Sequence, residues 1–108
     1  DLLQWDKALY QGKFVSMQSQ QLAYEPLSNE TRGKKNYGLG WHLYVDPPNP
    51  TIVYHNGWWH GNNAVFRRLI GDTATIIILG NKFNSNIWQA GKFSAVFTDM
   101  ELPEMDTE

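Results

Sequence analysis

The residues of this sequence whose types and spacing could carry chemistry gather in one short stretch, residues 54–62, which reads Tyr-His-Asn-Gly-Trp-Trp-His-Gly-Asn. On a strand, His55 and Asn56 would project to opposite faces, and Gly57 would let a ligand approach the backbone closely. Backbone N–H groups just past such a strand end can bind an oxyanion. The stretch therefore indicates one wall of a catalytic or binding site. The residues alone leave open a hairpin loop that merely buries its two tryptophans.

A nucleophile with its base is not recognisable in the sequence. Covalent catalysis needs a serine or cysteine beside a base, but the chain has no cysteine. None of the serines has a lysine three residues later; they are Ser16, Ser19, Ser28, Ser85 and Ser94. A G-x-S-x-G elbow and a glycine-rich phosphate loop are also missing. The nucleophile of any hydrolytic mechanism must therefore lie elsewhere, and this chain by itself is expected to be inactive.

The histidines do not predict a metal site, and no cofactor is expected. His55 and His60 are five residues apart, with no carboxylate between them. A zinc ion needs three or four well-placed ligands. We therefore assign no metal-binding residue.

Composition limits the possible classes of protein. The chain has 108 residues, enough for one small domain, with 42% hydrophobic and 19% charged residues, which is globular composition. A net charge of −2 argues against a nucleic-acid binder, which would carry a basic face. No apolar run approaches the ~20 residues that span a bilayer. The chain opens on Asp1 without a basic leader, as an excised interior segment would.

The elements that would hold the 54–62 stretch can be read from periodicity. An apolar stripe predicts a helix over residues 1–11, and Ser16 is placed to cap a second short helix that ends before Pro26. Residues 28–36 are polar and predict a loop. Four strands follow, over residues 39–45, 51–56, 63–70 and 73–80, with 57–62 as a loop and Gly71-Asp72 as a tight hairpin. Residues 76–79 are apolar on both faces, which predicts a strand covered on both sides.

The last predicted element is a helix capped by Asn84 or Ser85 and ending near Phe97. Together these elements predict an α+β fold, with an antiparallel sheet of about four strands flanked by N-terminal helices and a C-terminal helix. Residues 1–100 would form the folded part. Residues 101–108 are acidic and are expected to be disordered.

An ordered set of motifs resembles the C-terminal third of serine β-lactamase-like proteins, which include class C β-lactamases, penicillin-binding D-alanyl-D-alanine carboxypeptidases and related esterases. The motifs are Tyr-Gly-Leu-Gly-Trp at 37–41, His-Asn-Gly at 55–57 and Ile-Ile-Ile-Leu-Gly-Asn at 76–81, with the opening Asp-Leu-Leu-Gln-Trp and the closing helix. The likeness runs to about Phe97. The family's third motif, Lys-Thr-Gly, has a common His-x-Gly variant, which His55-Asn56-Gly57 would match.

The resemblance implies a role for each matching residue. His55 would face the cleft in the place of the lysine, where it could bind a substrate carboxylate or move a proton. Asn56 would orient substrate, and the N–H of Trp58, one past Gly57, would be the second donor of the oxyanion hole. Trp59 and His60 would lie at the rim of the cleft. The S-x-x-K and Y-x-N motifs of the family are absent in the expected form.

The resemblance therefore implies the C-terminal portion of a serine acyl hydrolase that acts on a β-lactam, a D-Ala peptide or an ester. It also implies a small-molecule or peptidoglycan-derived substrate and a periplasmic or other extracytoplasmic location. Histidine in place of lysine removes a permanent positive charge, which leaves esterase or amidase chemistry open. Two alternatives remain: a noncatalytic carbohydrate- or peptide-binding module that uses the tryptophans, and a noncatalytic scaffold of the same fold. In the family, two N-terminal strands lie beside the strand that corresponds to residues 73–80. In a fragment this apolar edge would be bare, so the isolated chain is expected to self-associate or to be only modestly stable.

Overall fold

The computed structural model describes residues 1–27 and 34–97. Two α-helices open the chain, α1 (Leu2–Tyr10) and α2 (Met17–Ala23). Five strands follow: β1 (Lys35–Tyr37), β2 (His42–Tyr44), β3 (Ile52–Trp59), β4 (Asn62–Leu69) and β5 (Ala74–Gly80). A short 3₁₀ turn, η1 (Ile70–Asp72), joins β4 to β5, and a 3₁₀ helix, η2 (Ser85–Val96), follows the last strand. The predicted α+β class is confirmed.

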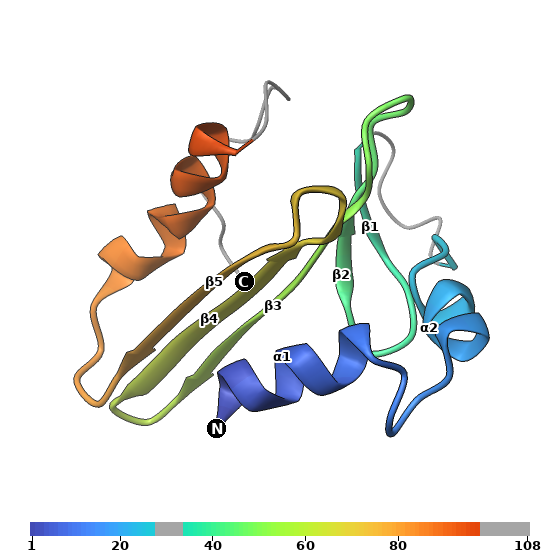
Figure 1. Cartoon of the computed structure of the whole chain (residues 1–108). Coiled ribbons are helices and arrows are strands. Elements are labelled where there is room, and N and C mark those ends of the chain that lie inside the picture. The colour runs from blue at the N-terminus through green and yellow to red at the C-terminus, as the bar shows by residue number, and fades with distance from the viewer. Residues whose placement is uncertain (28–33, 98–108) are drawn as a thin grey trace.

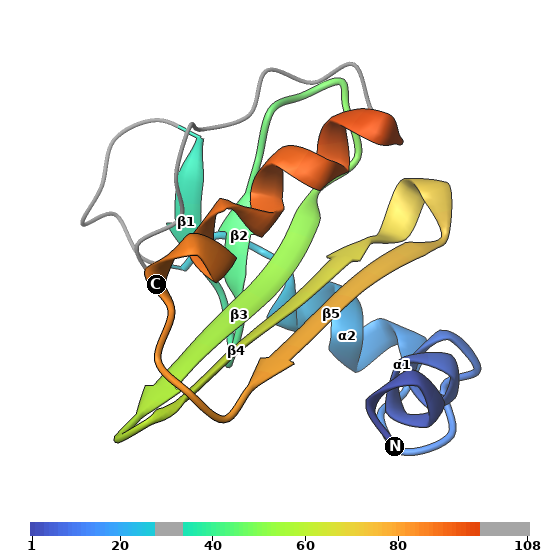
Figure 2. The same ribbon diagram turned by 90° about the vertical axis from the view of Figure 1, so that its left-hand side faces the viewer.

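The strands form one antiparallel sheet in simple chain order, β1-β2-β3-β4-β5. Helices cover the sheet on both faces: α1 and α2 lie on one side, and η2, drawn in orange to red, crosses the other (Figures 1 and 2). Because each connection joins neighbouring strands, the sheet is a continuous meander.

The caps predicted from sequence are present where a side chain can reach a free backbone N–H. The Ser16 hydroxyl accepts from the N–H of Ser19 at 3.1 Å, which begins α2. Asn84 caps η2 in the same way, by accepting from the N–H of Asn86 at 3.0 Å. Asp1 lies at the N-cap of α1 without a side-chain cap bond. Gly12 follows that helix with φ +66°, the left-handed conformation that ends helices.

The hydrophobic core lies mainly between the sheet and η2. One cluster joins Tyr44, Ile52, Tyr54 and Leu69, and the other joins Val65 of β4 to Trp88 and Ala90 of η2. These strand residues share one face, because the register pairs Tyr44 with Ile52 and directly opposed residues point the same way. The opposite face carries Leu43, Val53 and Arg68 under the two N-terminal helices.

Several predicted boundaries were wrong, each for a tertiary reason. Part of the predicted 28–36 loop is strand β1, which pairs with β2; residues 28–33 of that loop lie outside the described residues. The strand predicted at 39–45 is confined to His42–Tyr44, because a turn closed by the Gly38 N–H and the Trp41 carbonyl, 2.9 Å apart, precedes it. The predicted hairpin is present, because β5 folds back antiparallel on β4, but its turn is not the tight Gly71-Asp72 pair. A 3₁₀ turn connects the strands instead, and the left-handed residue is Thr73, with φ 51°.

Two further predictions about the late elements also need correction. The apolar segment at 76–79 is not covered on both sides: Leu79 is 68% exposed, and the residues before it are half-buried. The last helix has the predicted bounds, but its turns are 3₁₀. The predicted disordered tail at 101–108 lies outside the described residues.

Candidate functional site

Strand β3 is longer than its neighbour β2, and the candidate residues lie on the part that extends beyond it. β2 pairs with β3 only at Ile52, Val53 and Tyr54. On the other side, β4 pairs with β3 along its whole length, to Trp59. From His55 onward, no strand among the described residues therefore lies against the β2 side of β3. The predicted 57–62 loop was wrong: the strand continues, and only His60 and Gly61 form the turn.

The register decides which backbone groups face this open side. Trp59 and Asn62 flank the two-residue turn, and the pair that closes such a hairpin exchanges both backbone hydrogen bonds. Bonded pairs then recur at every second residue, so that His55 and Gly57 bond to β4. The N–H and C=O groups of Asn56 and Trp58 consequently point away from β4, toward the open side. The backbone of this segment thus presents a donor at Trp58 where the sequence placed an oxyanion-hole donor.

His55 lies half-buried at the start of the open segment, with both ring nitrogens in contact. Its Nδ1 is 2.7 Å from the carbonyl oxygen of Asn56. Its Nε2 is 3.4 Å from the hydroxyl oxygen of Tyr37. The first contact agrees with the register, because it needs the Asn56 carbonyl to point out of the β3–β4 ladder. The ring is therefore held along the edge of the strand.

Four rings form a cluster around this position, which we call the His–Tyr cluster: Tyr37, His42, Tyr54 and His55. The His42 ring stacks on Tyr54, with centroids 5.3 Å apart, and lies 5.0 Å from the His55 ring. The Tyr37 ring meets His42 edge-on at 4.8 Å. Tyr37, His42 and Tyr54 stand opposite one another on three adjacent strands, so the register aligns these three rings. The His55 ring, from the next position of β3, lies against the rings of Tyr37 and His42.

The next two residues of the motif differ in exposure and face. Asn56 points to the η2 face and is 2% exposed, and its two amide atoms are buried without a hydrogen-bond partner. Gly57 shares the face of His55, and a Cβ there would meet only the Cβ of Ala64, at 3.9 Å. That face therefore has room beside His55. A separate open depression of about 570 Å³ lies at the ends of β4 and β5, lined by Asn62, Asn63, Ala64, Leu79, Gly80 and Asn81.

The tip of the β3–β4 hairpin is aromatic and exposed. Trp58 is 59% exposed and Trp59 is 75% exposed, on opposite faces of the strand. The Trp58 indole N–H donates to the His60 carbonyl at 3.0 Å, and its ring packs on Phe83 at 5.4 Å. His60 adopts φ 53° in the turn. Both tryptophans are thus accessible to a ligand at the tip of the hairpin.

Sequence reasoning missed three residues of this neighbourhood: Tyr37, His42 and Phe83. Tyr37 is part of a motif that was recognised, but only the pairing of β1 with β2 brings it to His55.

Within residues 1–27 and 34–97, no three histidine or acidic side chains gather as they would around a metal ion. In the same part of the chain, no helix has the length and apolar character needed to cross a bilayer.

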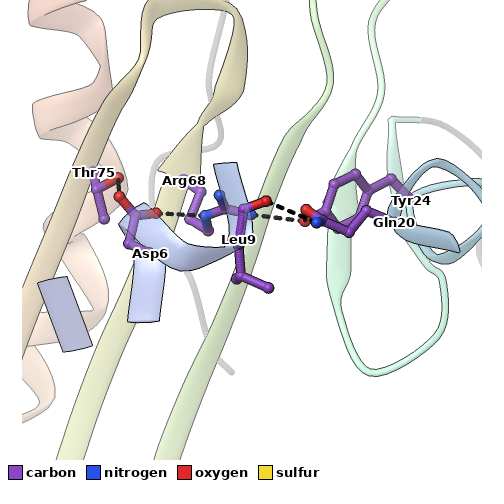
Figure 3. A network of polar contacts seen from close by, with 6 residues as sticks. All are labelled: Asp6, Leu9, Gln20, Tyr24, Arg68 and Thr75. Atoms are coloured by element: carbon purple, nitrogen blue, oxygen red, sulfur yellow. Dashed lines mark hydrogen bonds and ion pairs between the residues drawn. The ribbon is translucent and has the colours of Figure 1, made fainter. Parts of the chain in front are cut away.

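A buried polar network on the opposite side of the sheet from η2 fixes the strands that carry the site (Figure 3). Arg68 of β4 donates from Nε to Asp6 of α1 at 2.5 Å and from Nη1 to the Tyr24 hydroxyl at 2.7 Å. The other Asp6 oxygen accepts from Thr75 of β5 at 2.9 Å. Burial raises the pKa of Tyr24, against the opposing effect of Arg68. One arginine thus joins both N-terminal helices to the middle of the sheet.

Comparison with known proteins gives one informative similarity. No family model matches the chain, and no solved structure matches it. Penicillin-binding protein 4* of Bacillus subtilis (strain 168) is 38% identical over 82 residues, which are 76% of this chain and 18% of that protein. A stretch of that length includes the middle of a 108-residue chain, and with it strand β3. The chain spans about a fifth of its relative. Over this stretch it is similar to a penicillin-binding protein, in agreement with the resemblance read from its motifs.

Proposed function

We propose that the chain supplies one wall of the active site of a serine acyl hydrolase related to the penicillin-binding proteins. The observation that supports this most directly is the uncovered β2 side of β3. His55 and the backbone N–H of Trp58 both lie along it, within a segment similar to such a protein. The nucleophile and its base would come from residues that this chain does not contain.

Each group on the open segment has a defined task in the proposal. The Trp58 N–H stabilises the oxyanion of the tetrahedral intermediate. His55 handles a proton or binds the substrate next to it. Asn56 acts through its backbone, because its side chain is buried on the other face. The substrate is a β-lactam, a D-Ala peptide or an ester, with esters and amides favoured because histidine replaces a permanently charged lysine. The location is extracytoplasmic.

The sharpest test removes the Trp58 N–H without removing the strand. Trp58→Pro deletes the donor, and it breaks no bond to β4, because that N–H points away from the ladder. In the full hydrolase that contains this chain, we expect kcat to fall by roughly 10²–10³. Trp58→Ala is the matched control, since it removes the ring and keeps the N–H. Equal turnover by the two variants, with both folded, would contradict the assignment.

A second candidate function is favoured by the exposure of Trp58 and Trp59. Exposed, nearly flat indole surfaces beside asparagine amides suit a sugar or a peptide. In this reading the tip binds a ligand without chemistry. Titration of the intrinsic tryptophan fluorescence with soluble glycans and peptides would detect it. Trp59→Ala should then abolish binding, and the wild-type full protein should show no turnover.

A further inference from the structure

We propose that Tyr37 is a positioning residue for His55: its hydroxyl donates to Nε2 and keeps the imidazole in the form that carries its proton on Nδ1. The inference rests on the proposed function, because it assigns the chemistry that His55 brings to that site. It is carried by two contacts of one ring and by the register of β1, β2 and β3.

The first step concerns Nδ1. This atom lies 2.7 Å from the carbonyl oxygen of Asn56. A backbone carbonyl can only accept a hydrogen bond, so Nδ1 must carry a proton. Because the register turns the Asn56 carbonyl out of the β3–β4 ladder, the oxygen is available for this bond.

The second step concerns Nε2. In a neutral imidazole with its proton on Nδ1, Nε2 is an acceptor. The Tyr37 hydroxyl, 3.4 Å away, is therefore the donor. The distance is long for such a bond, as is common where a site tightens only with its ligand bound. The Asn56 carbonyl thus specifies the tautomer, and the Tyr37 hydroxyl, which can donate or accept, complements it by donating.

The third step concerns what holds Tyr37. Its carbonyl accepts from the N–H of Leu27 at 3.0 Å, and the following turn is closed by the bond from Gly38 to Trp41 at 2.9 Å. Its ring is fixed edge-on to His42, at an interplanar angle of 78°. The hydroxyl is therefore delivered to His55 by backbone bonds on one side and by the His–Tyr cluster on the other.

The consequence is a change in the chemistry of this wall. A lysine in the same place only donates hydrogen bonds. His55, held with Nε2 as acceptor, can instead receive a proton or a hydrogen bond from a hydroxyl group. The site then suits neutral acyl compounds, which are esters and amides that place no carboxylate next to His55. A substrate hydroxyl or an attacking water would exchange places with the Tyr37 hydroxyl at Nε2.

The tautomer can be measured directly on the ¹⁵N-labelled 108-residue chain by long-range ¹H–¹⁵N correlation of the His55 ring. We expect a protonated, pyrrole-type Nδ1 and a pyridine-type Nε2. Tyr37→Phe should shift the Nε2 resonance, because water then replaces the Tyr37 hydroxyl as the hydrogen-bond donor to this pyridine-type nitrogen. Tyr54→Phe is the matched control: it deletes a hydroxyl from the same cluster, and it should leave both His55 nitrogens unchanged.

Three outcomes would overturn the inference. One is an Nε2–H tautomer in the wild-type chain, and another is a His55 spectrum that Tyr37→Phe does not change. Should Tyr37→Phe fail to fold, the wild-type chain labelled with 3-fluorotyrosine replaces it. The more acidic fluorinated phenol donates a stronger hydrogen bond and must shift the Nε2 resonance. An Nε2 resonance that stays in place on labelling is therefore the third outcome that would overturn the inference.

The spectra test Tyr37 whether or not the parent protein is a hydrolase. The proposed function fails separately, if the Trp58→Pro and Trp58→Ala variants of the full protein turn over substrate equally. If both ideas hold, Tyr37→Phe in the full protein lowers kcat more than it raises KM for a neutral ester.

Discussion

Asp6 and Arg68, 62 residues apart in the chain, form an ion pair with side chains only 6% and 1% exposed. The guanidinium also lies over the Tyr10 ring, 4.6 Å from its centroid. Arg68 occupies the position of β4 opposite Val53 of β3, two residues before His55. The pair therefore ties α1 to the part of the sheet that carries the candidate site.

Breaking this pair should be costly, because the remaining charge stays buried. Asp6→Ala is expected to lower the free energy of unfolding by about 3–5 kcal/mol, as measured by urea denaturation. Asp6→Leu combined with Arg68→Met should recover much of that loss, since neither charge is then left alone. The comparison pair is Lys34 and Asp46, 44% and 25% exposed. Asp46→Ala should cost less than about 1 kcal/mol. Similar losses at Asp6 and Asp46 would disprove the structural role of the buried pair.

The two glycines of the 37–41 motif should respond differently to alanine. A Cβ on Gly38 would lie 2.0 Å from the carbonyl oxygen of Ala23, at the end of α2. Gly38→Ala must therefore push the helix away from the turn that places Tyr37. Gly40 has φ +76° and open space around it, so Gly40→Ala meets only backbone strain, about 1–2 kcal/mol. Thermal unfolding followed by circular dichroism should show a much larger loss for Gly38→Ala, and an equal loss would count against this packing.

Alkaline pH should destabilise the fold through its buried tyrosines. Burial raises the pKa of Tyr54 above its usual value, against the effect of Arg67, and burial likewise raises the pKa of Tyr24. Below the unfolded-state pKa of about 10, these phenols are neutral in both states and their stabilising effect is fully present. As the pH rises from there through the folded-state pKa, the unfolded chain loses its protons first, so stability is lost. Urea unfolding at about pH 9 and about pH 11 should reveal the loss.

Tyr54→Phe isolates the contribution of one phenol. This variant should lose less stability over the same rise in pH, because a group that cannot ionise is absent from both states. If wild type and variant lose equal stability, ionisation of Tyr54 is not the cause.

The β5 edge should drive association of the isolated chain. Among residues 1–27 and 34–97, β5 is the last strand of the sheet, and its Leu79 is 68% exposed. An apolar edge of this kind pairs readily with another chain. Sedimentation velocity should show oligomers that grow with concentration. Leu79→Lys should reduce them, whereas Leu22→Lys on α2, where the side chain is 56% exposed, should not. A sharp monomer at high wild-type concentration would rule out this association.

Local signals in the sequence determined most of the elements. Both α-helices and their starts were predictable, since a serine before a helix and a glycine after it act within a few residues. Strands β2 to β5 were predictable from their β-branched and aromatic runs, although β2 is shorter than predicted. The short strand Lys35–Tyr37 was not, because its polar residues form a strand only by pairing with β2.

Some features of the candidate site were likewise predictable from the sequence, and others depend on the tertiary structure. The sequence by itself pointed to His55, Gly57 and the Trp58 N–H as candidates, because a motif is a local pattern of residue types. It could not show that β2 ends opposite Tyr54 and leaves the next residues of β3 uncovered. Nor could it bring Tyr37 to His55 or Arg68 to Asp6, since those contacts depend on strand register and helix packing across long separations. The chemistry of the histidine is therefore decided by tertiary structure: the proton on a ring nitrogen follows the partners that the fold brings to it.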